Sequence, residues 1–201
     1  MSSARGLAPL SFRRLARSEL DCVHSLEFTP TQVERFLGPL DEIVAAVRHG
    51  PAHQMVGIEE GSDLIGFFAI HPDRRDGTRW WLGWFGIDSR RQGGGRGAQA
   101  VAAIMDRLRQ LGVCREIRLL VAPENQAALR LYRRAGFVLH GLSRRTGEFV
   151  MRCVLPLRRP SGEVPARFWA NAILMHVVEA RTCRMGLPVA AKLHGEVAFP
   201  P

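Results

Sequence analysis

The chain has 201 residues, of which 46% are hydrophobic and 23% charged, and this suits one globular domain of ordinary size with a short appendage. Its formal charge of +9 fits an anionic ligand, nucleic acid or an acidic partner without choosing among them. Aromatic residues make up only 7% and do not alternate with the arginine pairs, so the composition argues against a nucleic-acid binder that stacks bases.

The positions of the cysteines and the lengths of the apolar stretches indicate the cellular compartment in which the protein resides. The cysteines at positions 22, 114, 153 and 183 have no partner at metal-binding spacing, so we expect free thiols and no metal site. The longest nearly apolar stretches, around residues 80–87 and 169–178, are too short to cross a membrane. No apolar signal core follows the N-terminal residues, and we expect a cytoplasmic protein that binds no membrane.

The first half of the chain is predicted to hold a strand, two helical segments and three strands, over residues 9–15, 18–26, 30–49, 53–59, 63–71 and 80–88. Gly38-Pro39 divides the second helical segment, and Gly50-Pro51 ends it. Glu60-Gly61-Ser62 is a hairpin signal between the second and third strands. The last strand, WWLGWFGID, is rich in aromatic residues and follows a polar loop.

The second half continues with a helix that ends at Gly112, followed by a strand over residues 116–121 and a second helix over 125–135. A closing hairpin follows, with strands over 137–143 and 148–155. The order is therefore β-α-α-β-β-β-α-β-α-β-β, a mixed α/β domain over residues 1–157. Residues 158–201 are predicted to be a linker and C-terminal extension. Apolar spacing over 168–180 predicts an extra helix there, which must bury its apolar face on the same domain or on a second subunit in a homodimer.

Four glycines fall within five positions of QGGGRGA, residues 92–98, between a predicted strand and a predicted helix. Glycines let backbone N–H groups at a helix start point at an anion, and the helix dipole adds to the attraction. A P-loop needs Gly-Lys-Ser/Thr where Arg96-Gly97-Ala98 stands. A dinucleotide fingerprint needs an acid at the carboxyl end of the next strand, whereas Glu116 lies at its other end. Both of these phosphate motifs are disfavoured.

A third pattern, Gln/Arg-x-x-Gly-x-Gly/Ala, is matched by Gln92, Gly95 and Gly97. Downstream, LLVAPENQAALRLYRRAGF over 119–137 matches N-x-x-A-x-x-L-Y-x-x-x-G-F in register. With these two motifs the sequence resembles the GNAT superfamily of N-acetyltransferases, over about residues 8–157. The resemblance implies the α/β (α+β) fold of that family, a mixed central sheet of about seven strands with flanking helices.

The resemblance also implies acetyl-CoA as co-substrate, no metal, and transfer of the acetyl group to a primary amine by direct attack on the thioester. It implies that Tyr132 is the general acid for the departing thiolate and that the cofactor-binding residues are Phe85, Gly86, Ile87, Gln92, Gly93, Gly94, Gly95, Arg96, Gly97, Ala98, Asn125 and Tyr132. Asn125 suits a helix N-cap as well, and Tyr132 suits a core position. A non-catalytic CoA-binding sensor or interaction module on the same fold is the alternative function.

The sequence leaves several candidates for the general base that deprotonates the amine and for the amine that accepts the acetyl group. No carboxylate lies within the strand at 80–87, so the amine loses its proton through water or to His71, Asp73 or Glu27, while Asp88 suits a turn or cap. The stretches RFLGPL, LIGFFAI and WWLGWFGID resemble bacterial polyamine and diamine acetyltransferases, in which a basic residue usually stands where Trp84 is. A small cationic amine is therefore the leading acceptor. It needs carboxylates in the groove, for which the candidates are Glu27, Glu34, Asp73 and Asp76.

Overall fold

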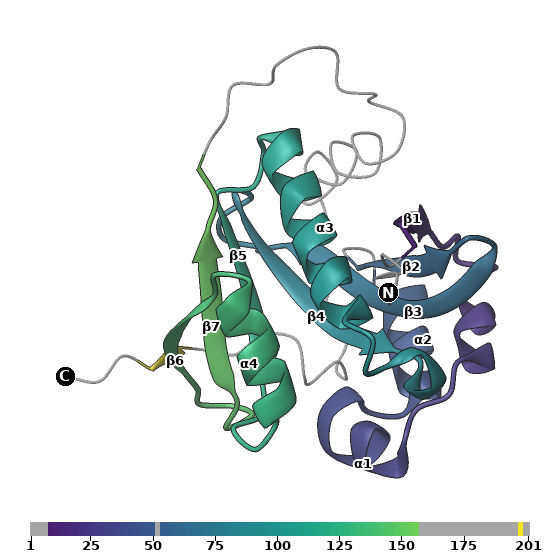
Figure 1. Cartoon of the computed structure of the whole chain (residues 1–201). Helices are drawn as coiled ribbons and strands as arrows, with labels where there is room; N and C mark the ends of the chain where they lie inside the picture. The colour runs from purple at the N-terminus through teal and green to yellow at the C-terminus, as the bar shows by residue number, and fades with distance from the viewer. Residues whose placement is uncertain (1–7, 51–52, 157–196, 199–201) are drawn as a thin grey trace, which may run out of the picture.

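Eight strands form one mixed sheet in the order β1-β2-β3-β4-β5-β7-β6-β8, with helices packed on both of its faces (Figure 1). The computed structural model describes residues 8–50, 53–156 and 197–198. The strands are β1 (Leu10–Arg14), β2 (Gln54–Glu60), β3 (Asp63–Pro72), β4 (Arg79–Ile87), β5 (Glu116–Val121), β6 (Val138–Ser143), β7 (Phe149–Val154) and β8 (Val197–Ala198). The helices are α1 (Pro30–Gln32), α2 (Leu40–His49), α3 (Arg96–Leu111) and α4 (Gln126–Arg134), with 3-10 turns η1 (Leu20–Ser25) and η3 (Ser89–Arg91) and a π-helical turn η2 (Val33–Leu37).

The predicted order of elements is confirmed, with differences at both ends of the chain. The first helical segment is a 3-10 turn, and the second is split into α1, η2 and α2. Thr29 starts α1 with a capping box to Gln32, and Gly38, at φ +90°, separates η2 from α2. The two-residue strand β8, which the sequence pattern does not predict, pairs antiparallel with β6. The rest of the predicted extension, including its helix over 168–180, lies outside the described residues.

The core forms two clusters on opposite faces of the sheet. Alternate residues of a strand point to opposite faces. Ile70 of β3 and Leu82 of β4 pack with α3 and α4 in one cluster. Phe67 of β3 packs with η1 and α2 in the other, and Trp84 of β4 lies against this second cluster. A strand buried on both faces has a nearly continuous apolar sequence, which accounts for the aromatic-rich composition of β4.

Strand β4 is irregular where it matters for the site. Its pairing with β3 shifts between Phe67↔Gly86 and Ala69↔Gly83, so the stretch contains a bulge. Trp84 sits in this bulge with φ +45°, the one non-glycine residue with positive φ in the described part of the chain. On its other edge β4 pairs in parallel with β5 only from Arg79 to Trp81. The two strands therefore diverge after Trp81, which opens the sheet.

The described residues contain no helix long and apolar enough to span a membrane. Cys22, Cys114 and Cys153 are free thiols, and Cys183 lies outside the described part. Among the residues that the structure describes, no three histidine, cysteine, aspartate or glutamate side chains are grouped so as to hold a metal ion.

Candidate active site

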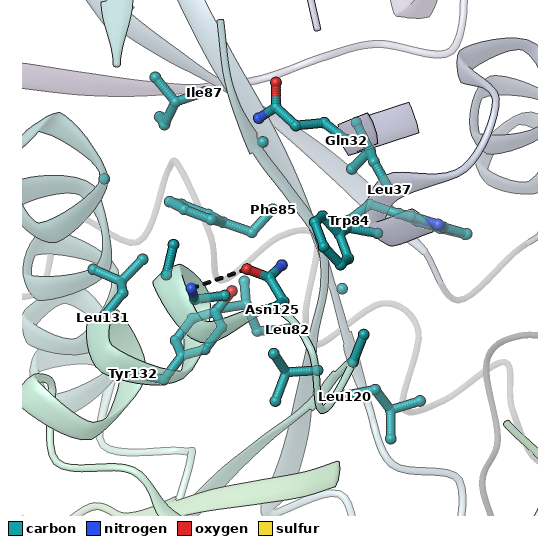
Figure 2. Close-up of a pocket in the computed structure, with 18 of the residues that line it drawn as sticks. Gln32, Leu37, Leu82, Trp84, Phe85, Ile87, Leu120, Asn125, Leu131 and Tyr132 are labelled. Atoms are coloured by element: carbon teal, nitrogen blue, oxygen red, sulfur yellow. Dashed lines mark hydrogen bonds between the residues drawn. The ribbon is translucent and has the colours of Figure 1, made fainter. Parts of the chain in front are cut away.

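A cavity of about 1220 Å³ lies where β4 and β5 diverge. Its walls come from β4, from the glycine loop at the start of α3, from α4, from the α1–η2 segment and from the β6–β7 turn. Figure 2 shows Tyr132 and Leu131 entering from α4, with Gln32 and Leu37 across β4 from them. The cavity is thus lined from both faces of the sheet, because Leu82 belongs to the α3 side and Leu37 to the α2 side.

The predicted cofactor residues converge on this cavity. All of those predicted from β4, the glycine loop and α4 line it except Gly94. Gly93 and Gly95 adopt left-handed backbone, with φ of +81° and +79°, which side chains disfavour. Within the described part of the chain no protein acceptor takes the N–H groups of Gly93, Gly94 or Gly95. The first three N–H groups of α3 have no intrahelical partner either, so the loop presents a row of donors suited to an anion.

Side chains of the loop hold it in place. Gln92 donates from Nε2 to the carbonyl of Ile87 at 2.7 Å and so ties the loop to the end of β4. The guanidinium of Arg96 forms a two-pronged ion pair with Glu60, with a shortest N–O distance of 2.6 Å. These contacts fix the backbone from which the N–H groups point.

Asn125 is the N-cap of α4. Its Oδ1 accepts a hydrogen bond from the N–H of Ala128 at 3.1 Å, the dashed line in Figure 2. The prediction that Asn125 is a helix N-cap is therefore confirmed. Asn125 also lines the cavity, so its amide nitrogen remains a candidate for a ligand contact.

Tyr132 lies on the buried face of α4 and is 7% exposed. Its ring packs edge-on against Phe137, with 5.6 Å between centroids. Burial raises the pKa of Tyr132 well above its usual range, so the phenol is neutral and keeps its proton at physiological pH. Its hydroxyl has no hydrogen-bond partner among the described protein groups. A neutral, unpartnered phenol at a cavity wall can donate a proton there.

Asp88 follows β4 and serves as a cap, as the sequence favours. It is 2% exposed and accepts hydrogen bonds from the N–H of Glu27, from the N–H of Arg90 and from the Arg90 guanidinium. These donors, the guanidinium foremost, lower the pKa of Asp88 to about 2. A carboxylate so firmly ionised and so fully bonded is a poor proton acceptor.

Of the three side chains left open as base, only His71 lines the cavity. Asp73 instead accepts hydrogen bonds from the indole N–H of Trp81 and the N–H of Arg75. Glu27 forms an ion pair with Arg90 at 3.0 Å, outside the cavity.

The acidic residues expected in the acceptor groove are placed differently from the prediction. None of Glu27, Glu34, Asp73 and Asp76 lines the cavity. The carboxylates that do line it are Glu124, just before the α4 cap, and Glu148, in the β6–β7 turn. Arg35 of η2 reaches Glu124 at 3.4 Å. The sequence did not predict these two carboxylates, because it does not show which turns lie beside the opening between β4 and β5. The one available signal was that Glu124 stands next to Asn125 in the second motif.

Comparisons with known proteins agree with this geometry. The profile of the Acetyltransferase (GNAT) family matches residues 18–137. The chain belongs to this family. It is 37% identical over 105 residues to the spermine/spermidine N(1)-acetyltransferase of Bacillus subtilis (strain 168), a match that covers 49% of this chain and 68% of that protein. Family and relative together support N-acetyltransferase activity.

Solved structures share the fold. Spermidine N-acetyltransferase from Vibrio cholerae, in complex with CoA and spermine, superposes with a TM-score of 0.58 at 22% identity, over 72% of this chain and 95% of that one. An aminoglycoside acetyltransferase in complex with coenzyme A superposes with a TM-score of 0.61 at 16% identity, over 72% and 94%. At these identities the likeness shows the GNAT fold alone.

Proposed function

We propose that this N-acetyltransferase transfers the acetyl group of acetyl-CoA to a primary amine of a small cationic acceptor such as a polyamine, with Tyr132 as general acid. The observation that carries the proposal is the cavity between β4 and β5, which has unpartnered backbone donors at one end and a neutral, buried tyrosine in its wall.

The residues present fit the co-substrate. The donors of the Gly93–Ala98 loop suit the pyrophosphate, since it is a dianion that accepts several hydrogen bonds at once. Beyond Trp81 the β5-facing edge of β4 has no strand partner in the described chain. Backbone groups of Phe85 to Ile87 on that edge suit the two amides of the pantetheine arm, which pair with it as an added strand would.

The chemistry needs a proton donor on the leaving group. A neutral amine attacks the thioester carbonyl carbon, the carbon–sulfur bond breaks, and its electron pair goes to sulfur. The hydroxyl of Tyr132 supplies the proton that the thiolate takes up, and the amide nitrogen releases a proton that restores the phenol. Positioned proton transfer of this kind contributes about 10²–10⁴-fold.

The acceptor side of the cavity has apolar walls and carboxylates. Phe28, Phe36, Trp81 and Trp84 line it and suit the methylene chain of a polyamine. Glu124 and Glu148 suit its ammonium groups. Arg35, Arg130, Arg134 and Arg145 also line the cavity and oppose a cation, so the pairing of Arg35 with Glu124 matters for acceptor binding. The similarity to a spermine/spermidine acetyltransferase favours the polyamine.

A CoA-release assay tests the proposal. The wild-type chain and acetyl-CoA are incubated with spermidine, putrescine, an aminoglycoside or a peptide at equal concentration. We expect the highest kcat/KM with spermidine or putrescine. A preference for the peptide would refute the polyamine assignment alone. Tight CoA binding without release on any amine would leave the alternative, a CoA-binding module.

A further inference from the structure

The bulge in β4 changes the face of the sheet to which its side chains point. Ahead of the bulge, Trp80 and Leu82 pack on the α3 side. Trp81 and Gly83 alternate with them and therefore point to the other face. Strict alternation would return Trp84 to the α3 side, but Trp84 packs against the second cluster instead. The bulge thus gathers Trp81, Gly83 and Trp84 on the acceptor side of the cavity, which all three line.

Gly83 has no conformational or packing reason to be a glycine within the described chain. Its φ is not positive, so other residues can adopt its backbone conformation. A Cβ at Gly83 would have no described atom within 4 Å, its two chain neighbours aside. Gly86, also in β4, differs, because its Cβ would lie 2.8 Å from the Phe28 ring. An open glycine inside a strand is typical of a place that a ligand approaches closely.

The two indoles beside Gly83 are held in place. Trp81 is 7% exposed, and its Nε1 donates a hydrogen bond to Oδ2 of Asp73 at 2.9 Å. Trp84 is fixed at its backbone by the bulge, at φ +45°, and its side chain packs against the second cluster. The cross-strand partner of Gly83 is Ala69, so the side chain directly opposite is only a methyl group. Gly83 is therefore the lowest point between two aromatic walls.

We propose that Gly83 is the floor of an acceptor subsite, walled by the indoles of Trp81 and Trp84, which takes an unbranched aminoalkyl chain and excludes a bulky ring. The inference rests on the proposed acetyltransferase activity and assigns a specificity-determining residue to it. Flat aromatic faces suit methylene groups and attract an ammonium group through the ring quadrupole. A side chain at residue 83 would occupy the same space, so only glycine leaves the subsite open.

The subsite lies next to the point where β4 and β5 separate. Trp81 is the last residue of β4 that pairs with β5, and Leu82 lines the cavity from the α3 side. An amine held over Gly83 therefore lies beside the opening that leads to the α3 side. Glu124 and Glu148 line the same cavity and suit the second ammonium group of a diamine. A slim chain with an amino group at each end satisfies the aromatic walls and the carboxylates together.

Two diamines of equal charge and different width test the wild type. Putrescine is a linear chain, whereas trans-1,4-diaminocyclohexane has its amino groups on a ring. In the CoA-release assay, kcat/KM should be about 10–200-fold higher for putrescine. Equal values for the two diamines would overturn the assignment, because a slot that excludes rings cannot treat them alike.

Gly83→Leu fills the floor and should lower kcat/KM for putrescine by about 10–100-fold. CoA affinity by calorimetry should be unchanged, and the melting temperature should not fall, because the position has ordinary φ and open space. Gly83→Ala should give a smaller loss in the same direction. Gly77→Leu is the matched control, since Gly77 is equally open, has no positive φ and lies in the turn before β4, outside the cavity.

Trp84→Asn removes one wall and keeps a residue type that tolerates positive φ. The ratio of the two kcat/KM values, putrescine over the ring diamine, should fall by about tenfold, because the slot becomes wider. An unchanged ratio in a folded Trp84→Asn variant would show that the indole is not a wall of the acceptor subsite.

The variants at residue 83 can also refute the proposal. A folded Gly83→Leu variant with wild-type kcat/KM for putrescine would do so, and so would an equal loss in Gly83→Leu and Gly77→Leu. If Gly83→Leu melts early, Gly83→Ala takes its place, and wild-type kcat/KM in that variant counts against the subsite. A wild type that acetylates no amine refutes the proposed function, whereas an active wild type that is indifferent to residue 83 refutes only this inference.

Discussion

Tyr132 packs edge-on against Phe137 at 5.6 Å between ring centroids, while its hydroxyl has no protein partner in the described chain. The ring and the hydroxyl therefore have separate tasks. The ring holds α4 on the sheet, and the hydroxyl is left for the cavity. A substitution that removes the hydroxyl alone can distinguish the two.

Tyr132→Phe should lower kcat by about 10²-fold or more, because the leaving thiolate loses its proton donor. The melting temperature should stay within about 2 °C, since no protein hydrogen bond is lost. Steady-state kinetics and thermal unfolding check both expectations. Phe137→Leu, which disturbs the packing and keeps the hydroxyl, should do the reverse. A kcat within twofold of wild type would make Tyr132 a packing residue.

Gly95→Val should weaken CoA binding by about 10–100-fold, because a branched side chain at φ +79° distorts the backbone that carries the N–H donors. Gly112→Val is the matched control, since Gly112 caps the other end of α3 at φ +66° and lies outside the cavity. Both variants should lose stability. Only Gly95→Val should lose CoA affinity in calorimetry, and equal affinities for the two variants would count against the pyrophosphate site.

Glu124→Gln with Glu148→Gln should raise KM for spermidine by about 3–10-fold with CoA affinity unchanged, because partly exposed ion pairs contribute about 0.5 kcal/mol each. Arg35→Gln should lower that KM, because it frees Glu124 from its 3.4 Å pair. Glu34→Gln, outside the cavity, is the control and should change nothing. Initial-rate kinetics at low salt decide. An unchanged KM in the double variant would mean that the acceptor does not reach these carboxylates.

Asp88 makes the free energy of unfolding depend on pH in the acidic range. Its folded-state pKa of about 2 lies below the ordinary 3.8, so the stabilisation is present above pH 3.8 and is lost as pH falls toward 2. We expect Asp88→Asn to lose about 1–2 kcal/mol at pH 7, and less at pH 3. Urea unfolding at the two pH values checks this. A constant difference between wild type and variant would show that ionisation of Asp88 is not the source.

The sequence by itself determined the succession of elements and the cofactor loop. Both follow from local rules: apolar periodicity separates strands from helices, and the glycines between β4 and α3 have few physical explanations other than close approach to backbone. Helical spacing also places Asn125 at the start and Tyr132 on the buried face of α4, whereas their expected roles in the site came from the resemblance to the GNAT motif.

The tertiary structure decided which polar side chains share the cavity. That depends on where β4 leaves β5 and on which turns lie over the gap, and such contacts join residues far apart in the sequence. Asp73 accepts a hydrogen bond from the Trp81 indole and Glu27 pairs with Arg90, so neither lines the cavity. Glu124 and Glu148 line it instead, from two separate turns. Of the three candidate bases His71, Asp73 and Glu27, only the tertiary structure shows which one lines the cavity.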